Sequence, residues 1–445
     1  MGRLFGTDGV RGIANAELTP ELAFRLGEAA GRFLCDRGRG RIVVGKDTRR
    51  SGDMLEAALV AGICSAGSDA LTCGIVPTPA VAFLTRELGA DGGVVISASH
   101  NAAEYNGIKF FSRDGFKLPD EFEDEIAEFV EEGSRSTARP TGLGVGRAHA
   151  LADAADRYVA HVVASVPERL DGVRIALDCG HGAAARTSVH ALEALGADIV
   201  AINCDWDGMD INDGCGSTHL GPLVELVRSS GAALGLAHDG DADRVLAVDE
   251  TGAEVDGDQI MAVCAAQLKR EARLPHDTVV GTVMANLGFD VAMKELGIAL
   301  VKTKVGDRYV LDQMRTMGAT LGGEQSGHII FLEHATTGDG LATGLQLARV
   351  MKVTGKPLSE LTKVMHRYPQ VLVNVRVGDK ARLPASAAIA RAVAAEEERL
   401  GVTGRVLVRP SGTEPLVRVM AEAADLDVAR STVDRLVEVV KAELG

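Results

Sequence analysis

The hydrophobic positions of the chain form a pattern that occurs three times. An amphipathic stretch with helical period ends at a Gly followed by Ala, and a short apolar stretch containing Gly follows it. Each of these apolar stretches leads into an unusual polar loop: residues 97–101 (SASHN), 239–244 (DGDADR) and 324–328 (EQSGH). Gly just past a helix end is a common helix stop, and a short apolar run bounded by such signals is typical of a buried strand. We therefore predict three related α/β domains, each presenting one loop at a strand end.

The pattern changes in the last part of the chain, which is predicted to run strand, helix, strand, strand, helix. A stretch rich in Gly, Ser and Pro, residues 133–149, is typical of a linker region. The predicted fold class is α/β, with three related α/β domains and a smaller C-terminal α+β domain around a central cleft. The predicted domains are residues 1–150, 151–255, 256–370 and 371–445.

Composition and charge narrow the classes of function. The formal net charge is −15, from 47 basic and 62 acidic residues, which argues against a nucleic-acid or anionic-membrane partner. No apolar run approaches the ~20 residues that span a bilayer, and the first residues lack the apolar core of a signal peptide. Seven cysteines without a CxxC pair favour reduced thiols over disulfides or a zinc site. We expect a cytoplasmic protein.

The loop at 239–244 carries three alternating carboxylates, Asp239, Asp241 and Asp243. In an extended segment alternate side chains point the same way, so the three acids repel one another unless a cation lies among them. Oxygen-only ligands select a hard ion such as Mg²⁺. A solvated acidic turn is the alternative, whereas a calcium-binding EF-hand is excluded because Arg244 stands where that loop needs Gly. Arg244 is expected to contact an anion that the metal also touches.

Ser99 ends the first apolar strand and is the candidate nucleophile, although a serine in such a loop also forms ordinary turns. No clear Ser-His-Asp order and no GxSxG elbow supports acyl transfer. A serine beside a Mg²⁺ site and arginines suits phosphoryl transfer, where catalysis is mainly positioning and charge neutralisation.

A fourth loop, RPSGTEP, combines hydroxyls, a Gly and arginines in the way an anion cradle requires. Its candidate residues are Arg409, Ser411, Gly412, Thr413 and, on the next strand, Arg418. A hairpin with surface arginines is the alternative. No GxxxxGK[ST] occurs and no GxGxxG follows a strand, which disfavours nucleotide binding.

These loops, with the opening FGTDGVRG at residues 5–12, resemble the α-D-phosphohexomutase family over essentially the whole chain. The resemblance implies that Ser99 is carried as phosphoserine, and that a phosphate oxygen on it joins the three aspartates as a Mg²⁺ ligand. Arg11, Lys109 and His328 match basic residues around the reacting centre. Lys109 and His328 are the acid/base candidates, with ordinary ion pairing as the alternative for either.

The same resemblance assigns residues to the substrate. Glu324 and Ser326 match the residues that grip sugar hydroxyls, and the RPSGTEP loop with Arg418 matches the clamp for the phosphate that does not react. Segment 304–309 fits the specificity segment of the amino-sugar members. Ala102 stands where the family usually has Pro, which puts the stiffness of the Ser99 loop in question.

The implied activity is the interconversion of glucosamine 6-phosphate and glucosamine 1-phosphate through the 1,6-bisphosphate. A glucosamine or glucose 1,6-bisphosphate serves as primer, a kinase or a bisphosphate loads Ser99, and a homodimer is one assembly that the resemblance allows. The alternatives are a phosphomannomutase or phosphoglucomutase and a catalytically silent sugar-phosphate binder.

Overall fold

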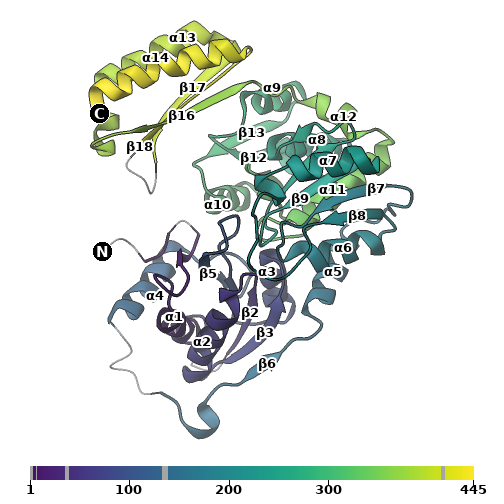
Figure 1. Ribbon diagram of the computed structural model, residues 1–445, viewed down its shortest axis with the longest axis vertical. Helices are drawn as coiled ribbons and strands as arrows, with labels where there is room; N and C mark the ends of the chain where they lie inside the picture. The colour runs from purple at the N-terminus through teal and green to yellow at the C-terminus, as the bar shows by residue number, and fades with distance from the viewer. Residues whose placement is uncertain (1–3, 7, 36–39, 133–138, 412–415) are drawn as a thin grey trace. The chain divides into compact units, whose positions relative to one another are not determined.

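The computed structural model describes most of the chain, namely residues 4–6, 8–35, 40–132, 139–411 and 416–445. The chain divides into two compact units, whose elements are labelled in Figure 1. The large unit comprises Met1–Met284 and Ile298–Val364, and the C-terminal unit comprises Ala285–Gly297 and Met365–Gly445. Among the described residues, no helix combines the length and the apolar character that crossing a membrane requires.

The first sheet of the large unit carries Ser99. Its strands, in spatial order, are β1 (Val10–Ile13), β5 (Tyr105–Ser112), β4 (Gly92–Ile96), β2 (Arg41–Lys46), β3 (Asp69–Ile75) and β6 (Ala148–Ala150). Ile42 and Val44 of β2 share an apolar core with α1 (Pro20–Phe33) and α2 (Ser51–Ser65), whereas Gly45 lies against Val81 of α3 (Thr78–Glu87). Because strand side chains alternate between faces, helices cover both faces of this sheet. Helix α4 (Asp120–Glu132) packs on α1.

Two further sheets complete the large unit. The strands of the second sheet, in spatial order, are β11 (Glu254–Val255), β10 (Val245–Asp249), β9 (Leu234–His238), β7 (Arg174–Asp178) and β8 (Asp198–Ile202). Those of the third sheet are β13 (Ala299–Thr303), β12 (Thr278–Thr282), β14 (Leu321–Gly323) and β15 (Ile329–Phe331). The accompanying helices are α5 (Ala154–Ala164), α6 (Ala184–Ala194), α7 (Gly221–Ser230), α8 (Gly257–Arg270), α10 (Asp307–Met317), α11 (Gly340–Thr354) and α12 (Leu358–Leu361).

Each sheet of the large unit contains the strand–loop–strand arrangement that the sequence predicted three times. The pairs β4–β5, β9–β10 and β14–β15 are all antiparallel, and each encloses one of the polar loops. The helix before each pair is followed by a left-handed Gly, with φ of 55° at Gly89, 65° at Gly231 and 67° at Gly318. The predicted helix stops and loop positions are confirmed.

The C-terminal unit contains a sheet in the order β16 (Gln370–Arg376), β18 (Leu416–Ala423) and β17 (Gly404–Pro410). Figure 1 shows α13 (Ala387–Leu400) and α14 (Leu426–Leu444) on one face of this sheet. Val433, Leu436 and Val440 of α14 lie in its apolar core. Along the chain the elements run β16, α13, β17, β18 and α14, which confirms the predicted strand–helix–strand–strand–helix order. Helix α9 (Leu287–Glu295) also belongs to this unit; the domain boundaries given above stay predictions.

Candidate active site

Ser99 lies in the loop between β4 and β5 and is buried, with 1% of its surface exposed. Its hydroxyl donates a hydrogen bond of 2.6 Å to Oδ2 of Asp239. The backbone of Ser99 has a φ of 52°, which lies in the left-handed region that side-chain-bearing residues rarely adopt. The loop therefore directs the candidate nucleophile at the acidic loop of the second sheet.

Asp239, Asp241 and Asp243 lie in the loop between β9 and β10 and form one cluster. All three are buried, and ligand oxygens of the three carboxylates lie within 4.8 Å of one another. Burial, together with the charges of Asp243 and Asp241, raises the pKa of Asp239 well above its usual value. The Oδ1 atoms of Asp241 and Asp243 have no hydrogen-bond partner among the described residues. A buried, oxygen-only donor set with spare lone pairs fits a hard metal ion, so these aspartates could hold one.

Lys109 of β5 is a buried cation beside the aspartates, with 2% exposure. Its Nζ lies 2.9 Å from Oδ2 of Asp241, 3.0 Å from Oδ2 of Asp8 and 3.8 Å from Oδ2 of Asp243. Burial lowers the pKa of Lys109, but these three carboxylates outweigh burial and raise it overall. These ion pairs hold Lys109 as a cation, which favours the ion-pairing alternative for this residue; its acid/base role stays a prediction.

Three residues of the site were not predicted from the sequence: Asp8, Lys117 and Asp307. The carboxylate of Asp8 pairs with Arg11 and Lys117, and Lys117 also pairs with Asp307. Burial opposes ionisation of Asp8, yet Lys109 and Lys117 lower its pKa well below the usual value. Asp8 lies in the opening motif that carried the resemblance, and Asp307 lies in segment 304–309, which the resemblance linked to specificity; no local signal pointed to Lys117.

His328 and Arg244 both contact the acidic cluster. Nδ1 of His328 is 3.5 Å from Oδ2 of Asp243, and the backbone N–H of Gly338 donates to Nε2 at 3.0 Å. The neutral ring therefore carries its proton on Nδ1. The backbone N–H of Arg244 donates to Oδ1 of Asp239 at 3.2 Å, and the Arg244 Nε lies 3.7 Å from Oδ1 of Asp243. The predicted catalytic and metal residues of the large unit thus form one connected cluster.

Glu324 and Ser326 lie in the third loop, between β14 and β15. Oε1 of Glu324 accepts a hydrogen bond of 3.0 Å from the backbone N–H of Gly306, which lies in the segment expected to set specificity. The side chain of Ser326 is exposed. Burial lowers the pKa of Arg244, but the charges of Asp243, Asp239 and Glu324 raise it overall.

The predicted phosphate clamp lies in the C-terminal unit. Arg409 of β17 and Arg418 of β18 are direct cross-strand partners, and Ser411 is buried just after β17. Burial and the neighbouring charge of Arg418 lower the pKa of Arg409. Like charges opposite each other destabilise a sheet, so this pair suits a bound anion. Gly412 and Thr413 lie outside the described residues.

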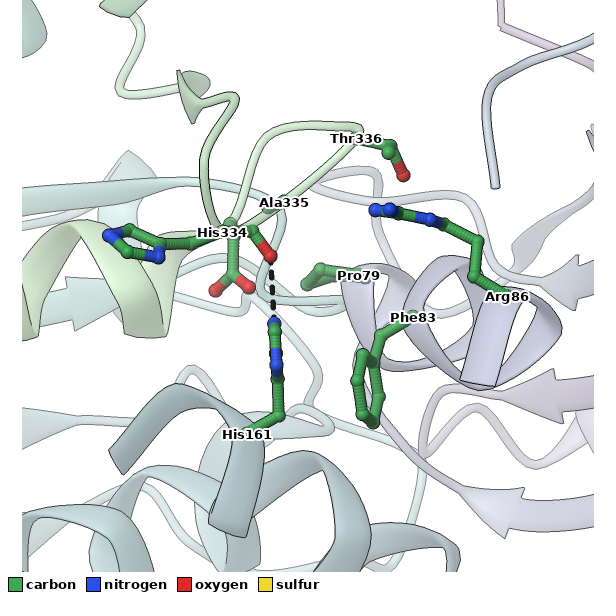
Figure 2. A pocket seen from close by; sticks show the side chains of 8 residues that line it. Pro79, Phe83, Arg86, His161, His334, Ala335 and Thr336 are labelled. Carbon is green, nitrogen blue, oxygen red and sulfur yellow. Dashed lines mark hydrogen bonds between the residues drawn. The ribbon is translucent and has the colours of Figure 1, made fainter. Parts of the chain in front are cut away.

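Two hollows of the large unit differ in what they could hold. The first, shown in Figure 2, is about 10 Å³ and lies where Phe83 stacks on His161 at 4.1 Å between ring centroids. His161 Nε2 donates to the carbonyl of His334 at 2.7 Å, and the space admits at most one water. The second is an open hollow of about 470 Å³ that adjoins the Ser99 loop, where His100 and Asn212 line it. Only the second has the size of a small-molecule site.

Four family models match consecutive stretches of the chain. They describe the alpha/beta/alpha domains I, II and III and the C-terminal domain of phosphoglucomutase/phosphomannomutase, and they match residues 2–137, 156–252, 256–368 and 372–439. The chain belongs to the phosphoglucomutase/phosphomannomutase family. The predicted family and the predicted fold class are confirmed.

Known members of the family are similar to the chain over their whole lengths. A protein of Streptomyces avermitilis named phosphoglucosamine mutase is 58% identical, and the alignment covers 100% of both chains. A crystal structure of a family protein from Burkholderia thailandensis has a TM-score of 0.82 at 24% identity, covering 98% of this chain and 97% of that one. N-acetylphosphoglucosamine mutase of Aspergillus fumigatus, solved with GlcNAc-6P and magnesium, has a TM-score of 0.69 at 19% identity, with 98% and 95% covered. These two structures establish the shared fold.

Proposed function

We propose that the chain is a phosphoglucosamine mutase, which interconverts glucosamine 6-phosphate and glucosamine 1-phosphate through a phosphorylated Ser99. The full-length identity of 58% to a relative of that name supports the choice of sugar. The observation that carries the chemistry is the 2.6 Å hydrogen bond from the Ser99 hydroxyl to Asp239, inside a cluster of carboxylates suited to a metal.

In the proposed reaction, phospho-Ser99 gives its phosphoryl group to the C1 hydroxyl of glucosamine 6-phosphate. The bond from the serine oxygen to phosphorus breaks, a bond from the sugar oxygen to phosphorus forms, and the proton of the sugar hydroxyl passes to the serine oxygen, which becomes a hydroxyl again. The resulting 1,6-bisphosphate turns around before the second transfer, because one serine serves both ends of the sugar. Ser99 then takes back the 6-phosphoryl group, and glucosamine 1-phosphate is released.

The residues around Ser99 have distinct tasks in this scheme. Lys109 supplies a fixed positive charge at the transferring group, and Arg11 and Arg244 add further positive charge. His328 holds its proton on Nδ1 and is the proposed site of proton exchange. The three aspartates, together with a phosphoserine oxygen, would hold Mg²⁺, which would supply charge neutralisation.

The remaining residues bind the sugar and the phosphate that does not react. Glu324 and Ser326 contact sugar hydroxyls, and an ammonium group at C2 would make a bond to Glu324 charge-assisted. Arg409, Arg418 and the loop between them hold the distal phosphate. A glucosamine or glucose 1,6-bisphosphate primes the enzyme, and either a bisphosphate or a kinase first loads Ser99. The cytoplasmic location and the homodimer stay predictions.

A phosphomannomutase or phosphoglucomutase is the second candidate, because the matching family models carry both of those names. The test is a coupled assay of glucosamine, glucose and mannose phosphates side by side, at saturating Mg²⁺ with each matching 1,6-bisphosphate. We expect kcat/KM for glucosamine phosphate to exceed the others by more than tenfold, about 1.4 kcal/mol in transition-state binding. Equal or better turnover of mannose or glucose phosphate would assign the enzyme to the second candidate.

The same assay tests the nucleophile. Ser99→Ala is expected to remove nearly all turnover of every sugar phosphate, and peptide mapping of active wild-type enzyme should place phosphate on Ser99. A fully active Ser99→Ala variant, or phosphate found only on another serine, would contradict the mechanism for all of these sugars.

A further inference from the structure

Arg49 is a buried arginine that binds the Ser99 loop through its backbone. Its side chain has 0% exposure, and its Nε donates to Oδ2 of Asp47 at 2.9 Å. The two Nη atoms donate to backbone carbonyls of one short segment: those of Ser99 (2.9 Å), Asn101 (2.7 Å), Tyr105 (2.9 Å) and Ala102. A planar guanidinium with five fixed donors suits this fan of acceptors, whereas the point-like ammonium of a lysine does not.

Asn212 binds the same loop from another part of the chain. It belongs to the connection between β8 and α7, and its Nδ2 donates to the carbonyls of Ser99 at 3.0 Å and Asn101 at 3.1 Å. The Ser99 N–H is held as well, since it donates to Oγ of Ser97 at 2.9 Å, and Ser97 in turn donates to Asp47 at 2.6 Å. Both backbone polar groups of Ser99 are therefore fixed from outside the residue.

We propose that Arg49 and Asn212 are positioning residues that hold Ser99 in the left-handed conformation required for phosphoryl transfer. The inference rests on the proposed function. With a φ of 52°, Ser99 is in an unfavourable conformation, and such conformations persist only when the surroundings impose them. Without its anchors the backbone relaxes, and the hydroxyl turns away from Asp239. The carbonyl of Ala102 is one of the acceptors, so the guanidinium stiffens the loop at the position where the family usually has Pro.

The test compares Arg49→Lys and Asn212→Gly with a matched control, Arg50→Lys. Arg50 is the exposed neighbour of Arg49, and among the described residues its guanidinium contacts the Met209 sulfur alone, at 4.0 Å. Lysine keeps the charge at 49 but cannot serve four carbonyls, and glycine keeps the positive φ of 62° at 212 while removing the amide. A displacement near 1 Å can cost about 100-fold in rate. We expect kcat to fall about that much in Arg49→Lys and at least tenfold in Asn212→Gly.

Three readouts separate positioning from general stability. KM should stay within about threefold, amide hydrogen exchange over residues 97–105 should accelerate, and loading of Ser99 by glucose 1,6-bisphosphate, followed by mass spectrometry, should slow in parallel with kcat. Arg50→Lys should match the wild type in all three. If Arg49→Lys does not fold, Asn212→Gly alone decides the outcome.

Variants that unfold earlier but keep wild-type kcat and loading rates would show that the contacts stabilise the fold only, and would overturn the inference. Failure of the proposed function is a different result, because wild-type enzyme would then take up no phosphate on Ser99 or turn over no hexose phosphate.

Discussion

Replacing Asp241 with Asn tests the metal site with a change of one charge and almost no change of shape. Oδ2 of Asp241 accepts hydrogen bonds from the Thr78 hydroxyl at 2.6 Å and from Lys109 at 2.9 Å, while Oδ1 has no hydrogen-bond partner among the described residues. The substitution removes one of three carboxylates, and the oxygen that remains is a neutral and weaker ligand. It also relieves repulsion from Asp239 and Asp243.

The distances in the structure give the size of the lost attraction and of the relieved repulsion in the metal-free protein. Carboxylate oxygens within 4.8 Å repel by roughly 3 kcal/mol per pair at an effective dielectric constant of about 20. Breaking a buried ion pair costs about 3–5 kcal/mol, but Lys109 keeps Asp8 at 3.0 Å. Relieving two such repulsions, roughly 6 kcal/mol in all, at least offsets this cost, so Asp241→Asn should be no less stable than the wild type in EDTA. With Mg²⁺ at about 100 times its dissociation constant the wild type gains about 2.7 kcal/mol, and the variant should gain less than about 1 kcal/mol.

The assay is thermal unfolding of both proteins in EDTA and in Mg²⁺, together with turnover in each buffer. Asp249→Asn is the matched control, because Asp249 ends β10 and caps its turn, accepting from the backbone N–H of Thr251 at 2.9 Å. That variant should lose stability equally in both buffers and keep the full Mg²⁺ increment. An undiminished increment in Asp241→Asn, or full wild-type activity in metal-free buffer, would refute the assignment.

Two further predictions concern the phosphate clamp and the acidic loop that packs against Ser99. Arg418→Ala should raise KM about tenfold or more, and kcat should fall only to the extent that binding of the distal phosphate positions the sugar. Unchanged KM for all three hexose phosphates in steady-state assays would contradict the clamp. Gly240→Ala should slow turnover and phosphate loading of Ser99 at least tenfold, because a Cβ at 240 would lie 2.8 Å from the Ser99 carbonyl oxygen. Quantitative mass spectrometry of Ser99 phosphorylation measures the loading. Loading at the wild-type rate would contradict the prediction, because it would show that the two loops can move apart without slowing phosphoryl transfer.

The sequence predicts those parts of the fold and site whose signals are local. Gly231, for example, ends a helix with φ of 65° and precedes a buried strand, and both features follow from the residue types near it. The alternation of three aspartates marked the cluster, but the extended geometry predicted for it is wrong: the segment is a turn with a φ of 54° at Ala242, not an extended strand, and the turn itself gathers the carboxylates. The contacts of Lys117 with Asp307, 190 positions away, depend on how the sheets pack. No periodicity or spacing in the chain reports such a pairing.

Arg49 shows a second limit of prediction from sequence. Arg49 lies beside Arg50 in a polar segment, and its residue type alone favours an exposed side chain. The structure instead buries it completely, because carbonyls of the Ser99 loop and Asp47 together satisfy its donors. A single sequence shows a donor-rich side chain but not the acceptors, which come from a loop 50 residues further on.

The charges of the site explain why the metal and the phosphoserine belong together. Asp8 is balanced by Lys117 and Arg11. Lys109 contacts Asp241 and Asp243, and Arg244 lies 3.7 Å from Asp243. These two cations against three buried carboxylates leave an excess of negative charge, and a phosphoserine adds about two more charges of the same sign. A bound divalent cation reduces the repulsion among the aspartates and their repulsion of the phosphoserine. Metal binding and phosphorylation of Ser99 should therefore favour each other by linkage. Removing the metal should therefore weaken the tendency of Ser99 to hold its phosphoryl group, and loss of the phosphoryl group should weaken metal binding by the same factor.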